Sequence, residues 1–280
     1  MSAPPHIALT NHKGGQGRSE LTKALACAAA EAGHRVLVID MDAQANLTRR
    51  LQAQLVPDLE QRAAHSLASV LLRPARGEIE RVLVPCGYGG IYTERITIAP
   101  GHLELELLAR TAAEPSSEKR LLRSLIGVVD GYDLVLIDCP PNLLGHLIDI
   151  AWTASDLVLV PTEPEYDGVE AARRVRERIY LDRDLLNPDL ELLGFIVNRY
   201  RQSLGVHQKR AAEVATIAGP EAACPIRVPE LSVFKTSSEN AQPLTADTST
   251  QGRNAVDLIG QVYQWTRNRA AALMNTEVNA

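Results

Sequence analysis

The sequence predicts an α/β fold with a mainly parallel, twisted sheet and helices on both faces. Short continuous apolar runs alternate with helical stretches along the 280 residues, a pattern typical of parallel strands that are buried on both sides. The first apolar run leads through a glycine-rich loop into an alanine-rich helix, which is the strand–loop–helix order of a phosphate-binding loop. No internal repeat or low-complexity linker interrupts the pattern. We therefore expect one domain over 1–280, with residues 1–5 frayed and 273–280 as a loose tail.

The elements can be assigned in chain order from these runs. The expected strands are 7–10, 35–40, 82–84, 96–98, 134–137, 156–160 and 192–198. The expected helices are 19–32, 115–127, 143–153, 167–181 and 253–272, with two further helical stretches between 40 and 96. Gly33 follows the first helix and should end it, because glycine readily adopts the left-handed conformation of a helix C-cap.

Composition and charge exclude several classes of protein. The formal net charge is -5, so the whole molecule does not attract polyanions, and nucleic-acid binding would need a local basic patch. No basic segment followed by a long apolar one opens the chain, and no apolar run could span a bilayer. We expect no signal peptide, no membrane association and a cytoplasmic location. The four cysteines form no C-x-x-C pair, which argues against a zinc ribbon.

The glycine-rich loop is KGGQGRS, residues 13–19. Gly14, Gly15 and Gly17 let successive backbone N–H groups point at one anion, and the start of the following helix adds partial positive charge. The hydroxyl of Ser19 could bind Mg²⁺. The alternative is a glycine-rich turn that binds no ligand. We favour the phosphate loop because the strand and helix on either side are in the right order.

Three aspartates stand at or just after predicted strand ends: Asp40, Asp42 and Asp138. Such an aspartate can simply cap the next helix. It can also belong to a site, because ligands of parallel sheets bind outside the carboxyl ends of the strands. For Asp40 both interpretations stay open, whereas Asp42 and Asp138 are expected in a site.

Four segments together resemble one known family. They are KGGQGRS, VLVIDMDAQANLT, YDLVLIDCPPNLLG and ASDLVLVPTEPEYDGVEA. These are similar to the deviant phosphate loop KGGVGKTT and three further boxes of the ParA/MinD family of dimeric ATPases, and most of all to the ParA proteins of DNA partition. The likeness extends through GFIVNRY and VPELSVFK. It implies a P-loop NTPase fold with a deviant Walker A loop.

The resemblance implies a role for each matching residue. Lys13 would cross a dimer interface to the partner's phosphates, Asp42 would orient the attacking water, and Asp138 would hold Mg²⁺ through its water shell. The cofactors would be ATP or ADP and Mg²⁺, with Ser19, Asp40 and Asp138 as the metal-site residues. The nucleotide-binding residues would be Gly14, Gly15, Gln16, Gly17, Arg18, Ser19, Glu20, Asn198 and Pro229.

The resemblance also implies partners. These are a second copy of the chain, a ParB-like centromere-binding protein and non-specific DNA in the nucleoid. A DNA surface would use the basic residues of the C-terminal third, which could equally be scattered solvated charges. They are Arg199, Arg201, Lys209, Arg210, Arg227 and Lys235. Glu230 weakens the case, because related sequences often have arginine there.

Two residues of the loop depart from the family pattern. Arg18 stands where the family has lysine, and its planar guanidinium does not fit the slot of a compact ammonium group. Glu20 replaces a small hydroxyl residue near the α-phosphate. At ~5 Å and an effective dielectric of ~20 its charge would repel a phosphate by roughly 3 kcal/mol, unless Glu20 turns away or pairs with a cation. Weak ATP hydrolysis is therefore expected, and the alternative is a dimerisation or scaffold protein with little or no ATPase activity.

Overall fold

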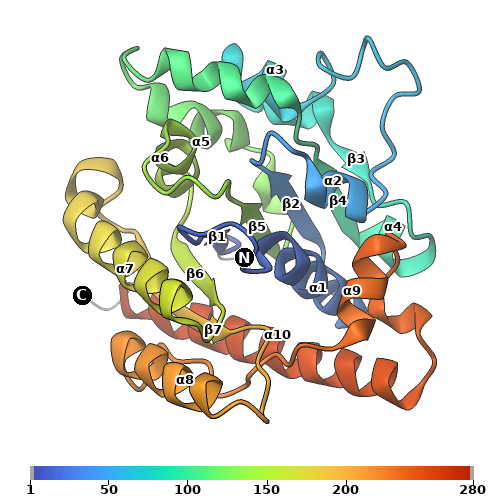
Figure 1. Cartoon of the computed structure of the whole chain (residues 1–280). Helices are drawn as coiled ribbons and strands as arrows, with labels where there is room; N and C mark the ends of the chain where they lie inside the picture. The colour runs from blue at the N-terminus through green and yellow to red at the C-terminus, as the bar shows by residue number, and fades with distance from the viewer. Residues whose placement is uncertain (1–2, 278–280) are drawn as a thin grey trace.

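A computed structural model describes residues 3–277, apart from the side chains of 109–111 and 276–277, and its centre is a seven-stranded sheet (Figure 1). The strand order is β3-β4-β2-β5-β1-β6-β7, and every neighbouring pair except β3 with β4 is parallel. The predicted α/β fold is therefore confirmed. The strands are His6–Leu9 (β1), Val36–Asp40 (β2), Val84–Pro85 (β3), Ile96–Ala99 (β4), Leu134–Asp138 (β5), Leu157–Thr162 (β6) and Glu191–Val197 (β7).

Helices cover both faces of this sheet (Figure 1). The first six are Arg18–Glu31 (α1), Asn46–Arg50 (α2), Leu67–Leu72 (α3), Gly90–Arg95 (α4), Arg120–Leu125 (α5) and His146–Thr153 (α6). The others are Tyr166–Leu186 (α7), Gly205–Ala218 (α8), Ser232–Glu239 (α9) and Thr250–Glu277 (α10). Short 3₁₀ helices lie at Glu78–Val82, Leu103–Thr111, Ser117–Lys119, Val129–Gly131 and Leu244–Ala246.

The central strands are buried on both faces, and their side chains alternate between two cores. In β5, Val135 and Ile137 contribute to the core under α3, α5, α6, α7 and α8. Leu134 and Leu136 contribute to the core under α1, α9 and α10. Successive residues of a strand point to opposite faces, so continuous apolar runs are what such a sheet requires.

Several element boundaries differ from the sequence prediction. Helix α7 ends at Leu186, and the predicted helix 115–127 is divided into a 3₁₀ turn followed by α5. The predicted strand 82–84 is only the two-residue, antiparallel β3. Helices α8 and α9 were not predicted as separate helices.

Both chain ends are more ordered than the sequence predicts, as far as they are described. Pro4 is buried, and the carbonyl of Pro5 accepts a hydrogen bond from the N–H of Val135 at 3.0 Å. Helix α10 continues to Glu277, and Leu273 packs against the second core. The expected fraying of 3–5 and the loose tail over 273–277 are therefore wrong, and residues 1–2 and 278–280 lie outside the described residues. None of the helices within 3–277 is both long and apolar enough to cross a membrane.

The strand order determines where a site can form. Strand β1 lies between β5 and β6, and β5 lies beside β2. The carboxyl ends of parallel strands meet at one edge of the sheet. The loop after β1, the aspartates at the ends of β2 and β5, and the residues that follow β6 and β7 are thereby brought to the same edge.

Candidate functional site

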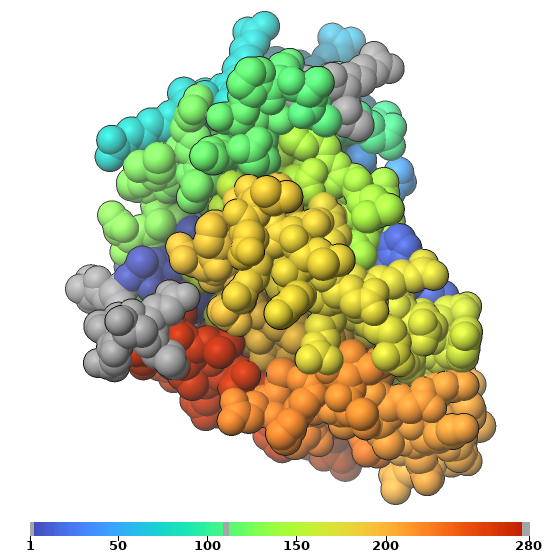
Figure 2. Space-filling model, turned by 90° about the vertical axis from the view of Figure 1, so that its left-hand side faces the viewer, coloured from blue at the N-terminus to red at the C-terminus, as the bar shows by residue number. Residues whose placement is uncertain are grey.

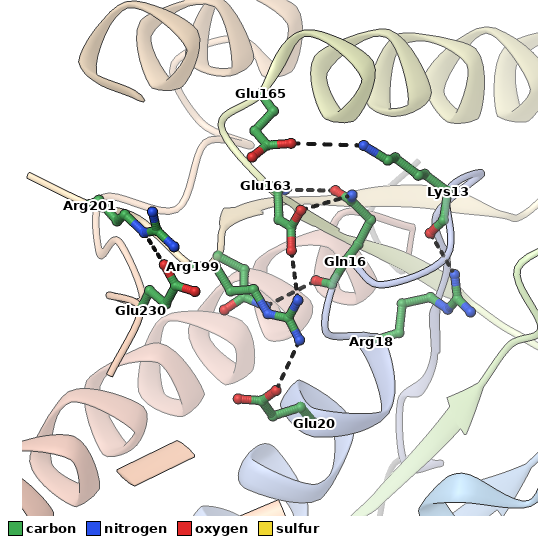
Figure 3. Close-up of polar contacts among 10 residues, drawn as sticks. Lys13, Gln16, Arg18, Glu20, Glu163, Glu165, Arg199, Arg201 and Glu230 are labelled. Atoms are coloured by element: carbon green, nitrogen blue, oxygen red, sulfur yellow. Dashed lines mark hydrogen bonds and ion pairs between the residues drawn. The ribbon is translucent and has the colours of Figure 1, made fainter. Parts of the chain in front are cut away.

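The loop between β1 and α1 forms the floor of the candidate site (Figure 3). Gly17 adopts φ 77° at the start of α1, a left-handed conformation that favours glycine. A Cβ at this position would lie 2.2 Å from Nδ2 of Asn198. The Nδ2 group of Asn198 donates to the carbonyl of Gln16 at 3.0 Å. No side chain of the described residues caps α1, so its first amide groups are left for a bound anion.

The Arg18 side chain is buried and bonded to the backbone. Its Nε donates to the carbonyl of Cys139 at 3.1 Å. Its Nη1 donates to the carbonyls of Asn11 at 3.1 Å and Lys13 at 3.3 Å. In Figure 3 the side chain points away from Glu163 and Glu20. The guanidinium therefore braces the underside of the loop, where the family lysine was expected to reach phosphate.

Glu20 is paired with a cation, one of the two conditions under which its charge would be tolerated. Its carboxylate lies 3.5 Å from Nη2 of Arg199, and Nη1 of Arg199 lies 2.9 Å from Glu163. Glu163 is in turn held by Gln16, whose Nε2 donates to its carboxylate at 3.4 Å and whose Oε1 accepts from its backbone N–H at 2.8 Å. Figure 3 shows these four side chains as one connected network over the loop.

Asp138 and Asp40 are direct neighbours across β5 and β2. Burial raises the pKa of both carboxyl groups. The negative charge of Asp40 further raises the pKa of Asp138, and the charge of Asp42 raises the pKa of both. Arg18 and a hydrogen bond with Ser19 lower the pKa of Asp138. One oxygen of Asp138, Oδ2, is buried and has no hydrogen-bond partner among the described residues.

The three aspartates differ in how much of each carboxylate is free. Asp40 accepts from the N–H of Asp42 at 3.2 Å on one oxygen. Its other oxygen accepts from both the N–H and the hydroxyl of Thr48, at 2.8 Å and 2.7 Å. Asp42 uses one oxygen for the N–H of Gln44 at 2.9 Å. These contacts favour a structural role for Asp40 and leave Asp138 and Asp42 with free oxygens.

The residues around Asp138 fit a magnesium ion that takes most of its ligands from phosphate and water. The unpartnered oxygen of Asp138 and the hydroxyl of Ser19 are hard oxygen ligands, which Mg²⁺ prefers. No group of three or more His, Cys, Asp or Glu residues within 3–277 could hold a metal ion by itself. An ion bound mainly by a nucleotide needs no such group.

Lys13 lies on the outer side of the loop and points toward α7 (Figure 3). Its Nζ is 3.5 Å from Asp167 and 3.9 Å from Glu165. Lys13, Asp167 and the exposed Tyr166 line a cavity of about 520 Å³. The ammonium group is thus available at the surface beside the loop and points away from the start of α1.

A second cavity, of about 320 Å³, lies on the other side of the loop and brings together three of the predicted nucleotide residues, Glu20, Asn198 and Pro229. It also contains residues that sequence analysis did not assign to this site; these are Arg50, Arg199, Glu230, Leu231, Phe234, Lys235, Ser238 and Glu239. A larger cavity, of about 640 Å³, lies between α7 and α8 and includes no predicted site residue.

The six basic residues proposed for DNA are placed on several segments. Arg199 and Lys235 line the 320 Å³ cavity. Arg201 is paired with Glu230, and Arg227 stacks 4.8 Å above the Tyr200 ring. The remaining two, Lys209 and Arg210, are on α8, where Arg210 pairs with Glu213 at 2.5 Å. In Figure 1, α8 lies beside α7, whereas α9, which carries Lys235, lies beside α1.

Figure 2 shows the side of the molecule that carries α7 and α8. In that view the α7 segment (yellow) and the α8 segment (orange) form one continuous surface. Three large apolar side chains of α7 are exposed: Tyr180, Leu181 and Leu185. None of them belongs to the loop cavities described above.

Comparison with known sequences gives consistent matches. A family model described as an AAA domain matches residues 5–192. The chain is 34% identical over 195 residues to an uncharacterized protein of Mycobacterium tuberculosis, which covers 69% of this chain but only 58% of that protein. It is 33% identical over 202 residues to the sporulation initiation inhibitor protein Soj of Bacillus subtilis, with 71% and 75% covered. It is 30% identical over 210 residues to the chromosome partitioning protein ParA of Myxococcus xanthus, with 74% and 69% covered.

Solved structures show the same fold. Cobyrinic acid a,c-diamide synthase from Mycobacterium smegmatis, with bound ADP and magnesium, superimposes with a TM-score of 0.68 at 27% identity, covering 85% of this chain and 92% of that one. The septum site-determining protein MinD from Pyrococcus horikoshii, complexed with Mg-ADP, gives a TM-score of 0.69 at 23% identity, with 92% and 94% covered. The second likeness concerns the fold alone.

Proposed function

Because this chain belongs to the ParA/MinD-type ATPase family, we propose that it acts as a ParA-like partition ATPase, in which ATP and Mg²⁺ join two copies into a dimer that binds DNA without sequence preference. The observation that carries this proposal is the cup at the carboxyl end of the sheet. Uncapped amides of α1 face it, and Asp138 brings to it a buried oxygen without a hydrogen-bond partner within 3–277. Such a cup suits a phosphate chain with its metal ion.

The cofactors are ATP or ADP and Mg²⁺, as in the relative from Mycobacterium smegmatis that binds ADP and magnesium. In our proposal the loop from Gly14 to Ser19 surrounds the phosphates, and Ser19 and Asp138 hold the ion. Mg²⁺ would neutralise charge on the phosphate oxygens. Asp42, with a free carboxylate oxygen near the same edge, would orient the water that attacks the terminal phosphate. Asn198 and Pro229 would contact the adenine in the 320 Å³ cavity.

The dimer would form on the face that carries Lys13. Tyr166 beside it is 63% exposed, and Leu144 on the loop after β5 is 76% exposed. Exposed large apolar side chains favour burial against another protein, and a second copy on this face would also receive the Lys13 ammonium group. A ParB-like partner would trigger hydrolysis and release DNA. In this proposal the protein works in the cytoplasm, on the nucleoid.

A second candidate function is a nucleotide-regulated dimer or scaffold with little or no hydrolysis. Arg18 favours it, because its guanidinium is bonded to three backbone carbonyls and so cannot stabilise charge on the transferred phosphate from its present position. The family function and this alternative share the fold and the dimer. They differ only in turnover.

Phosphate release and dimer size distinguish the two candidates. We expect slow release with ATP and Mg²⁺, faster release with a duplex of arbitrary sequence, and none after Asp42→Ala. The matched control is Asp189→Ala, which alters an exposed aspartate between α7 and β7. Light scattering should show an ATP-dependent dimer that Lys13→Ala abolishes. A dimer without phosphate release under any condition supports the scaffold, and a chain that neither binds ATP nor dimerises contradicts both.

A further inference from the structure

We propose that Arg199 determines nucleotide affinity, by neutralising Glu20 and by supplying the phosphate chain with the positive charge that Arg18 does not present. This inference rests on the proposed nucleotide site and names a further residue for it. It also gives Arg199 a different role from the DNA contact that its position in the basic C-terminal third suggests.

The first observation is that the Arg18 side chain is already bonded to backbone carbonyls. Its Nε and Nη1 donate to the carbonyls of Cys139, Asn11 and Lys13, and its side chain is buried beneath the loop. A guanidinium bonded in this way is a fixed brace. The upper side of the loop therefore lacks the cation that a loop lysine would place there.

The second observation is how Arg199 is held over the loop. Its guanidinium lies between Glu163, at 2.9 Å, and Glu20, at 3.5 Å (Figure 3). Its backbone has φ 52°, a left-handed conformation that costs a non-glycine residue about 1 kcal/mol or more and is frequent at functional sites. The Nε atom would be 3.8 Å from a Cβ placed on Gly17, so the side chain reaches the start of α1.

The third observation is that Gln16 and Glu20 of the loop belong to one network with Glu163 and Arg199. Gln16 fixes Glu163 through two hydrogen bonds, Glu163 fixes one side of the guanidinium, and Glu20 meets the other side. Glu20 and Arg199 also line the same cavity as Asn198. Because Glu163 holds Nη1 of Arg199, Nη2 can turn from Glu20 to a phosphate while the guanidinium stays in place.

Electrostatics determines the size of the expected effect. Without Arg199, Glu20 and Glu163 would present two unpaired negative charges beside an anionic ligand. Charges ~5 Å apart at an effective dielectric of ~20 change an affinity by about a hundredfold. The Glu20 side chain is only 18% exposed, so solvent screens this repulsion incompletely.

A double-mutant cycle tests the proposal. Calorimetry with ATP and Mg²⁺ would compare the wild type, Glu20→Gln, Arg199→Gln and the double variant. We expect Arg199→Gln to weaken ATP binding by about a hundredfold. Glu20→Gln alone should change the affinity by no more than a few fold, because Arg199 already neutralises Glu20, and the double variant should bind nearly as tightly as the wild type, so that the two effects do not add. Arg199→Lys, which keeps the charge, should retain most of the affinity.

Two controls separate this role from a structural one. Arg76→Gln alters an exposed arginine that does not line the 320 Å³ cavity, so it should leave ATP affinity unchanged. Urea unfolding of each variant checks the fold. The left-handed backbone at position 199 costs glutamine about as much as arginine, so the substitution does not change this strain.

The outcomes are distinct. Affinity of Arg199→Gln within twofold of the wild type, or effects of the two substitutions that simply add, would overturn this inference while leaving the nucleotide site intact. A wild-type chain that does not bind ATP at all would overturn the proposed function, and this inference with it. Strong coupling between positions 20 and 199, with rescue by lysine, supports the proposal.

Discussion

Arg18 makes hydrogen bonds that join three segments of the chain. It connects the loop after β1, at Asn11 and Lys13, to Cys139 at the end of β5. Truncating a buried charged donor leaves its acceptors unsatisfied in a site of low polarity, at a typical cost of about 3 kcal/mol. We expect Arg18→Ala to lower the free energy of unfolding by about that amount, measured by urea denaturation without nucleotide. Arg76→Ala, at an exposed position, should change it by less than about 0.5 kcal/mol. Equal effects would show that Arg18 is no brace.

Gly17 allows a test of the loop geometry itself. It has φ 77°, and a Cβ would lie 2.2 Å from Nδ2 of Asn198. We expect Gly17→Ala to cost roughly 1–3 kcal/mol of folding stability and to displace Asn198 from the carbonyl of Gln16. Gly14 is the matched control, because a Cβ there meets no atom within 4 Å. Thermal unfolding of both variants without ligand makes the comparison, and a larger loss for Gly14→Ala would contradict this loop conformation.

The sequence indicated which residues belong to the candidate site, but it did not indicate which of them contact one another. Glu20, Asn198 and Pro229, which the family resemblance assigned to the nucleotide, line one cavity. The pairing of Arg199 with Glu20 could not be predicted, since the two are 179 positions apart in the chain. Charge patterns along a sequence do not reveal which acidic residue an arginine meets after folding.

At the scale of whole elements, Lys23 joins α1 to the segment around α9. Its buried Nζ donates to the carbonyl and hydroxyl of Ser237, at 3.0 Å and 2.6 Å, and to the carbonyl of Gln242 at 2.9 Å. Three residues in and next to α9 form one wall of the 320 Å³ cavity: Leu231, Phe234 and Ser238. Lys23 thereby holds that wall against the helix that follows the loop.

The Lys23 tether predicts a specific pH dependence. Burial lowers the pKa of Lys23 to about 8, whereas in the unfolded chain it is near 10.4. Between these values the unfolded state binds more protons, so the folded state becomes more stable as pH rises from about 8 towards 10.4. Below about 8 both states are protonated, and the destabilisation by this group is complete. Relative to Lys23→Met, the wild type should therefore gain about 2 kcal/mol between pH 8 and 9.5. Urea denaturation of both proteins measures this difference. If the difference between their free energies of unfolding did not change with pH, the lysine would not be desolvated.

Elements were predictable where one apolar pattern was long and regular. The strands and α1 follow from buried runs and from Gly33, which has φ 92° directly after the helix. Helix α9 has only eight residues, and just Val233, Phe234 and Ser237 of them are buried, which leaves too short a periodic pattern. Helix α10 continues past the predicted end because Leu273 packs on a core built from distant residues, which local sequence does not reveal.

At the scale of the whole molecule, the sheet joins two cores that should unfold together. Neighbouring residues such as Leu136 and Ile137 in β5 enter opposite cores, so one core cannot lose this strand while the other keeps it. The single domain expected from the sequence then predicts one cooperative transition. Separate folding units would instead require each core to have its own strands.

The four cysteines provide a test of this cooperativity. Cys139 lies in one core, and Cys27, Cys86 and Cys224 lie in the other. All four are buried free thiols, and burial raises the pKa of each. A thiol reagent should therefore label none of them in the native protein. In increasing urea, with peptide mapping by mass spectrometry, all four should become reactive at the same midpoint. A midpoint for Cys139 that differs from the other three would mean that the two sides of the sheet unfold separately, which is incompatible with strands whose alternate side chains serve both cores.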